Sequence, residues 1–284
     1  MSKKLMIMEK AIELFSKNGV ESTSIQDITN ACGISKGAFY LSFKSKDDLL
    51  VEITDYFIKK FIAVQNEILD DSIQVNEKLP KFFYYNFRLL EEHYSFISMC
   101  MRENFLPMNN EVIQKIKEFN TVHNEALLTI IHQTYGEKVE HFKYDLLLVV
   151  RGLLISYTEF ITTHPRKYNF EQLANSLAEK VNIIAEHSTL HFVTEKLWNT
   201  KSASSFSEMV SKEHILYLLR QLEGQYKKTP LIDESIHLLM EELMKEKPRL
   251  AILSGLASNL QKNEDFSMVV FLVRQYVSNL QSVS

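Results

Sequence analysis

The chain has 284 residues, of which 45% are hydrophobic and 24% are charged, a composition typical of a soluble globular protein and unlike that of a disordered chain. Only seven glycines and five prolines are present, so few turns can be built and long helices are favoured over a many-stranded sheet. The formal net charge is −4, yet between Lys3 and Lys46 seven lysines outnumber four acids, which leaves −7 on the rest of the chain. A locally basic segment on an acidic protein suits an anionic partner at one end only.

The sequence pattern predicts no signal peptide, no membrane-spanning segment and no disulfide. Glu9 and Lys10 interrupt any signal-peptide core, and the longest apolar runs are far shorter than the roughly 20 residues that span a bilayer. Cys32 and Cys100 lack the spacing of metal ligands and no secretory context suggests that they form a disulfide. We therefore expect a cytoplasmic protein without a membrane partner.

The first 32 residues predict two helices. Residues 4–17 place apolar side chains at helical spacing, and Gly19 follows, where a glycine can enter the left-handed conformation that ends a helix. Ser24 can cap a second helix, with Asp27 three residues later as its capping-box partner.

A tight turn and a very short third helix come next. Gly33 supplies an unusual backbone angle, and the hydroxyl of Ser35 can cap a helix over about residues 36–41. Phe39 and Phe43 lie four residues apart and are expected to point back at the first two helices. Two short helices joined by a glycine turn, with apolar bracing behind the second, are what a protein needs to insert a reading helix into the major groove of DNA.

Several consecutive strings in this region resemble the DNA-binding signature of the tetracycline-repressor (TetR) family. The matching strings cover about the first fifth of the chain: Leu14–Gly19, Thr23–Ile28, Ala31–Tyr40 and Phe43–Leu50. Cys32 stands where the family usually has alanine, a change between small side chains that we expect to have no functional effect.

The resemblance implies roles for individual residues. The positions that contact DNA phosphates in the family are occupied here by Thr23, Tyr40 and Lys46. The positions that face base edges are occupied by Lys36, Gly37 and Leu41. Lys36 can donate to guanine O6 or N7, and Ser24 and Ser35 at the helix starts complete the predicted DNA-binding set. Tyr40 filling a surface crevice, and a module that contacts protein instead of DNA, remain alternatives.

The remaining four-fifths of the chain predict further helices. After one long helix from about Leu50, the pattern indicates helices at about 80–101, 110–134, 142–163, 170–196, 207–225, 231–245, 248–262 and 265–281. The predicted fold is all-α, with a helix-turn-helix domain over 1–50, a helical regulatory and dimerisation domain over 51–198, and a C-terminal helical extension over 199–284. Residues 202–205 are the best candidate for a linker.

The family resemblance implies that the second domain binds a small molecule and dimerises. The helices at 142–163 and 170–196 resemble the pair that builds the family's four-helix dimer interface, although an ordinary buried helix pair would have the same pattern. An aromatic and methionine-rich block, with one arginine, is the candidate ligand pocket: Phe83, Phe87, Phe96, Met99, Phe105 and Arg151. The alternatives are a plain core for the aromatic residues and, for Arg151, an ion pair with Glu103 or Glu159.

These observations predict a homodimeric transcriptional repressor that leaves a palindromic double-stranded DNA operator when a small, apolar effector binds. The alternative is a helical interaction protein that acts through a protein partner bound to the C-terminal helices. These helices could enlarge the ligand domain, extend the dimer interface or form a partner-binding layer. No nucleophile elbow, P-loop or dinucleotide fingerprint is present, so we expect neither an enzyme nor a cofactor. His187 and His191 lie one helical turn apart without a third ligand, and no metal site is expected.

Overall fold

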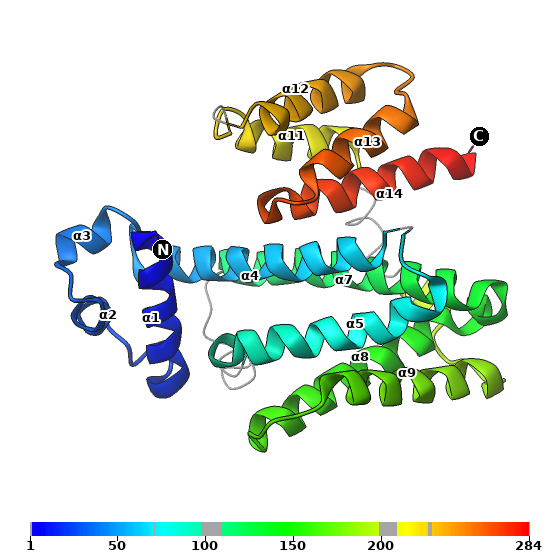
Figure 1. The fold of residues 1–284 in the computed structure, drawn as a ribbon, viewed down its shortest axis with the longest axis horizontal. Coiled ribbons are helices and arrows are strands. Elements are labelled where there is room, and N and C mark those ends of the chain that lie inside the picture. The colour runs from blue at the N-terminus through cyan, green and yellow to red at the C-terminus, as the bar shows by residue number, and fades with distance from the viewer. Residues whose placement is uncertain (1, 71, 98–109, 199–208, 227–228, 284) are drawn as a thin grey trace. The chain divides into compact units, whose positions relative to one another are not determined.

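The computed structural model describes residues 2–70, 72–97, 110–198, 209–226 and 229–283, and within these ranges every regular element is a helix (Figure 1). The helices form two compact units that alternate along the chain. Unit 1 takes residues 1–58, 79–120 and 146–188, whereas unit 2 takes 59–78, 121–145 and 189–284. The predicted all-α fold is confirmed, while the predicted three-way division into domains stays a prediction. The linker expected at 202–205 lies outside the described residues.

Unit 1 begins with the three predicted helices, α1 (Lys3–Asn18), α2 (Ile25–Cys32) and α3 (Lys36–Tyr40). Ser2 caps α1 by accepting from the Leu5 N–H, and Gly19, at φ 86°, ends the helix by donating its N–H to Phe15 O. Large apolar side chains from all three helices fill one core, in which the fully enclosed members are Ile7, Phe15, Ile28, Phe39, Phe43, Leu49 and Ile53. The core also includes the start of α4 (Lys46–Ile68), so the module is built onto that long helix.

Four longer helices follow, α5 (Val75–Glu92), α7 (Asn110–Tyr135), α8 (Lys143–Thr163) and α9 (Phe170–His187), with the 3₁₀ turn η1 (Gly136–Phe142) before α8. Within unit 1, Phe87 of α5 stacks on Phe170 at the start of α9, with ring centroids 6.0 Å apart. The expected helix start at Pro80 is wrong, because α5 begins five residues earlier at Val75 and includes the proline. The hydrogen bond that Pro80 cannot donate would go to Asn76 in the first exposed turn, where water can replace it.

The helix predicted over 170–196 is also shorter in the structure, because α9 ends at His187. The chain turns to an extended conformation at Ser188, and the backbone N–H groups of Phe192 and Val193 both donate to the Asp145 carboxylate at 3.0 Å. Leu190, within the predicted helix range, lies after the helix end and is exposed. A carboxylate far away in sequence holds the extended segment that follows the helix, which local periodicity cannot indicate.

The C-terminal part of unit 2 is a bundle of four helices: α11 (Lys212–Leu222), α12 (Pro230–Met244), α13 (Leu250–Leu260) and α14 (Ser267–Val283). Helix α12 packs on α11 and α13, and α14 packs on α11 and α13 (Figure 1). The buried apolar stripes predicted for these helices form its core. A turn of 3₁₀ helix, η2 (Glu264–Phe266), joins α13 to α14.

The bundle is attached to the distal part of α4, also within unit 2. Lys59 pairs with Asp265 at 2.9 Å and Lys60 with Glu264 at 3.3 Å. Arg274 of α14 donates to Asn66 O at 2.6 Å, at the end of α4. The described part of the C-terminal helices thus contacts α4, and the three roles considered for residues 199–284 stay predictions.

One stretch within Asn110–Thr163 is long and apolar enough to cross a membrane, judged by length and composition alone. Core helices of proteins that never enter a membrane meet the same criterion, and this stretch contains α8, whose exposed apolar side chains are considered below.

Candidate DNA-binding interface

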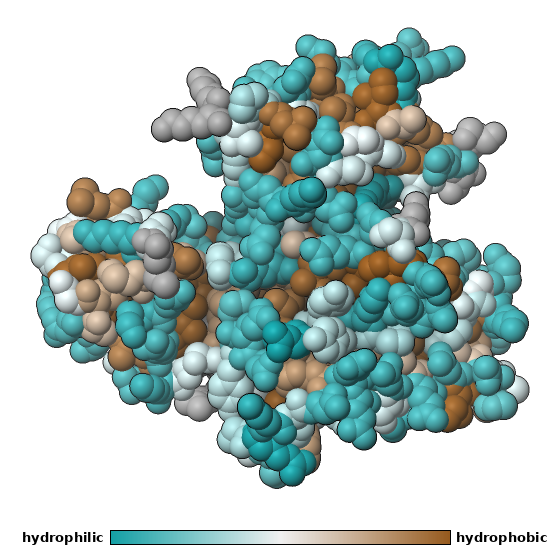
Figure 2. Space-filling view, viewed as in Figure 1, coloured by the Kyte–Doolittle hydropathy of each residue, from teal (hydrophilic) through white to brown (hydrophobic). Residues whose placement is uncertain are grey.

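Helix α3 and the residue that follows it expose four residues of the predicted DNA-binding set. Lys36, Gly37, Tyr40 and Leu41 are all exposed, with 53% of Tyr40 and 87% of Leu41 accessible to solvent. Hydrophobic side chains are visible on the surface of this module in Figure 2. A single exposed apolar side chain is ordinary, but Tyr40 and Leu41 lie next to each other beside the exposed Lys36 and Gly37, so the exposed residues form one contiguous surface.

The opposite face of α3 is fixed from behind. Phe39 is completely buried and holds Tyr40 edge-to-face, with ring centroids 5.6 Å apart, and also contacts Phe43. Gly33, at φ 64°, gives the sharp turn between α2 and α3, and Ser35 caps α3 by accepting from the Ala38 N–H at 3.2 Å. The sequence thus makes α3 short, rigid and open on one side.

Helix α2 is capped as predicted. Ser24 Oγ accepts from the Asp27 N–H at 3.2 Å, and the Asp27 carboxylate accepts from the Ser24 N–H at 2.9 Å. The Ser24 hydroxyl also donates to the Asp27 carboxylate at 2.6 Å, and this bond, followed by the one from the Ser24 N–H, lowers the pKa of Asp27. Ser24 and Ser35, both exposed at helix starts, therefore also fix the geometry of the module.

Two residues predicted to contact DNA phosphates, Thr23 and Lys46, form hydrogen bonds within the N-terminal module. Thr23 is fully buried, and its hydroxyl donates to Gly19 O at 2.8 Å. The Lys46 ammonium donates to backbone carbonyls at Val20 (3.0 Å), Glu21 (3.4 Å) and Thr23 (3.1 Å). The donors of both side chains are thus used inside the module, an arrangement that no local sequence signal indicates.

Two lysines keep the α3 region basic. Lys36 and Lys44 are exposed, and within the described ranges neither forms an ion pair. The Asp48 carboxylate, four residues after Lys44, accepts from the backbone N–H of Lys44 at 2.7 Å. Both ammonium groups are available to an anionic partner.

The predicted ligand-pocket residues that the structure describes do not line one common cavity. Phe83 and Phe87 are enclosed in the core, Met99 and Phe105 lie outside the described residues, and Phe96 stacks on Phe57 with centroids 3.6 Å apart. Arg151 on α8 is half-buried, and this burial lowers its pKa. In the part of the chain that the structure describes, Arg151 has no ion-pair partner, and Glu159 is exposed.

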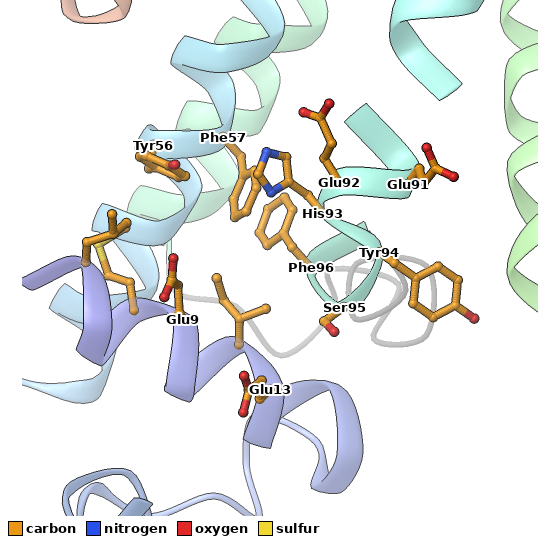
Figure 3. A pocket seen from close by; sticks show the side chains of 13 residues that line it. Glu9, Glu13, Tyr56, Phe57, Glu91, Glu92, His93, Tyr94, Ser95 and Phe96 are labelled. Carbon is orange, nitrogen blue, oxygen red and sulfur yellow. The ribbon is translucent and has the colours of Figure 1, made fainter. Parts of the chain in front are cut away.

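Unit 1 does contain a pocket of about 470 Å³, shown in Figure 3. Its walls come from α1, from Tyr56 and Phe57 of α4, and from residues 91–96, so of the predicted set only Phe96 lines it. Carboxylates surround the opening, but Glu13 is paired with Lys10, and Glu91 is paired with an arginine. No sequence pattern indicates this pocket, because three separate segments of the chain build it.

A short exposed helix, braced by aromatic residues and preceded by a capped helix and a glycine turn, defines a helix-turn-helix DNA-binding protein. Residues 7–53 match the model for "Bacterial regulatory proteins, tetR family". The chain is 30% identical over 274 residues to the HTH-type transcriptional regulator YerO of Bacillus subtilis, an alignment that covers 93% of this chain and 91% of YerO. The chain belongs to the tetR family, and it is a DNA-binding transcriptional regulator.

Two further similarities each cover part of the chain. The HTH-type transcriptional repressor KstR2 of Mycobacterium tuberculosis is 24% identical over 140 residues, which are 49% of this chain and 69% of that protein. The crystal structure of the Bacillus subtilis regulator FadR in complex with stearoyl-CoA has the same fold, with a TM-score of 0.54 and 23% identity over 63% of this chain and 97% of FadR. The alternative of a protein that acts only as a partner-binding scaffold is not favoured by these relatives.

Proposed function

We propose that the protein represses transcription by binding a palindromic operator as a homodimer, with α3 in the major groove. The observation that carries this proposal is the face of α3, where Lys36, Gly37, Tyr40 and Leu41 are exposed around a buried Phe39. In this arrangement Lys36 donates to a base edge, and the Tyr40 hydroxyl donates to a phosphate.

Operator binding by variants of two residues tests this interface. Lys36→Ala should cost about 1–3 kcal/mol and relax the preference at one base pair in each half-site, whereas Tyr40→Phe should weaken binding to all operators equally. Lys167→Ala, an exposed lysine after α8, is the matched control and should bind like the wild type. Unchanged affinity in both α3 variants would remove α3 from the interface.

An apolar stripe along α8 supports the homodimer. Leu148 and Ile155, seven residues apart, are exposed on one face of α8, with 54% of Ile155 accessible, and Ile183 is exposed on α9. Gly152, between the first two, has open space where a side chain would stand, so a second helix can approach closely there. An exposed apolar helix face that is buried against its own copy is typical of a symmetric dimer. Ile155→Lys should give monomers in sedimentation, with operator affinity greatly reduced.

The effector is proposed to have an apolar chain and an acidic group. A half-buried guanidinium attracts an anion strongly because it has lost part of its hydration, and Arg151 is such a group. The similarity to FadR, whose structure contains stearoyl-CoA, agrees with this chemistry. Here the effector would stabilise the state with lower affinity for DNA.

Release of a labelled operator by two ligands with the same chain tests the effector class. Stearoyl-CoA should release the operator at lower concentration than the uncharged stearyl alcohol, and Arg151→Met should reduce the difference by about tenfold or more. Arg166→Met, which removes a surface arginine placed over the Tyr168 ring, is the control. Equal release by both ligands in the wild type would exclude an acidic group from recognition.

A further inference from the structure

The Lys46 ammonium lies at the turn between α1 and α2, where three backbone carbonyls face it. Its Nζ atom is 3.0 Å from Val20 O, 3.4 Å from Glu21 O and 3.1 Å from Thr23 O. An ammonium has three donors and no acceptor, so these carbonyls account for its whole hydrogen-bonding capacity. We call Lys46 and these three carbonyls the lysine clasp.

The carbonyls of this turn differ in their surroundings. Val20 and Thr23 are buried, whereas Glu21, Ser22 and Ser24 are exposed. The Thr23 hydroxyl donates to Gly19 O, and the Thr23 N–H donates to Val20 O at 3.3 Å, so Val20 O has a second donor besides Lys46. The carbonyl of buried Thr23 depends most on Lys46, because a buried carbonyl without a donor costs free energy comparable to a lost hydrogen bond.

The position of Lys46 in α4 is otherwise unfavourable. It is the first residue of the helix, where the helix dipole favours acids, and Asp47 and Asp48 follow it there. Ser45 caps α4 by accepting from the Asp48 N–H at 3.0 Å, so α4 does not need the lysine. Across the described residues Lys46 forms no ion pair, and its interactions are with the turn.

We propose that Lys46 is a positioning residue, which ties the start of α4 to the α1–α2 turn and so fixes α2 and α3 on α4 in the orientation that binds DNA. This rests on the proposed DNA interface, but it assigns Lys46 to the protein's own backbone instead of a phosphate.

Salt dependence of operator binding separates the two roles. Lys46→Met should lower affinity by roughly fivefold to a hundredfold, the usual range for coupled sites, with the same slope of log affinity against log salt as the wild type. Lys46→Arg keeps the charge, but its planar guanidinium cannot match three converging carbonyls, so it should be impaired as well. A phosphate contact predicts the reverse: Met would reduce the slope by about 0.9, and Arg would bind nearly normally. That result would overturn the clasp.

Hydrogen exchange on the DNA-free protein gives a second test that does not depend on operator binding. In Lys46→Met the amides of Gly19 and Thr23 should exchange faster than in the wild type, whereas the matched control Lys44→Met, at an exposed lysine, should leave them unchanged. Unchanged protection in Lys46→Met refutes the clasp. Failure of Lys36→Ala and Tyr40→Phe to affect operator binding would instead refute the DNA interface and leave the exchange result standing.

Discussion

Gly37→Ala should make the protein more stable and a weaker DNA binder. Gly37 is the second residue of α3, is exposed, and has no left-handed backbone angle. A Cβ atom there would meet only Ser35 Oγ, at 3.8 Å, which is ordinary van der Waals contact. Alanine in a helix is favoured over glycine by roughly 0.5–1 kcal/mol, and nothing in the module offsets this gain.

The same methyl group stands on the surface proposed to face base edges. There it prevents close approach of the α3 backbone, and loss of one base contact costs about 1–3 kcal/mol of operator affinity. Thermal unfolding by circular dichroism, alongside fluorescence polarisation of a labelled operator, measures both effects on one sample. We expect a rise in Tm of a few degrees at most, together with about tenfold weaker binding or more.

Gly33→Ala is the matched control, because it adds the same methyl group to the same module. Its Cβ would also stand in open space, but the backbone has φ 64°, so an L residue costs about 1–2 kcal/mol in strain alone. This variant should lose stability and, once folded, bind the operator normally. Wild-type affinity in Gly37→Ala would show that α3 does not approach DNA with this face, and a lower Tm would contradict the local geometry of α3.

Three further outcomes test the module and the C-terminal bundle. Ser24→Ala removes the reciprocal cap with Asp27 and should destabilise unit 1 by about 1 kcal/mol in urea unfolding, with Ser24→Gly less affected. Burial, followed by the hydrogen bond to Asp265, raises the pKa of Tyr226 to about 12, from about 10 in the unfolded chain. The neutral phenol therefore stabilises unit 2 fully below a pH of about 10, and this stabilisation is lost as the pH rises through about 12. Tyr226→Phe should flatten that part of the stability profile, and an unchanged profile would refute the linkage. Leu253→Ala in the core of the bundle should cost about 2–5 kcal/mol, and a loss below 1 kcal/mol would contradict its complete burial.

Much of the N-terminal module could be predicted from sequence because its signals are local. The capping serines, the glycine at a left-handed angle and the phenylalanines four residues apart each depend on neighbours within one or two turns. The exposure of Tyr40 and Leu41 follows from the burial of Phe39, since α3 is too short to bury two faces.

The contacts that were missed join distant parts of the chain. Lys46 reaches a turn more than twenty residues earlier, and Lys59 pairs with Asp265 more than two hundred residues later. A lysine at a helix start or on a helix face has the same sequence pattern whether it binds a phosphate, a carboxylate or water. The choice is decided by which backbone the folded chain brings within 3–4 Å, and periodicity carries no information about that.

The last turn of α4 is enclosed by cations. Buried Lys78 donates to Leu69 O and Asp70 O at 3.3 and 3.1 Å, while Arg274 occupies Asn66 O. The final carbonyls of a helix are ordinarily hydrated and the end frays, but here unwinding would break the hydrogen bonds from Lys78 and Arg274. The end of α4 should therefore fray less than an ordinary helix end, and its last amides should be slow to exchange with solvent.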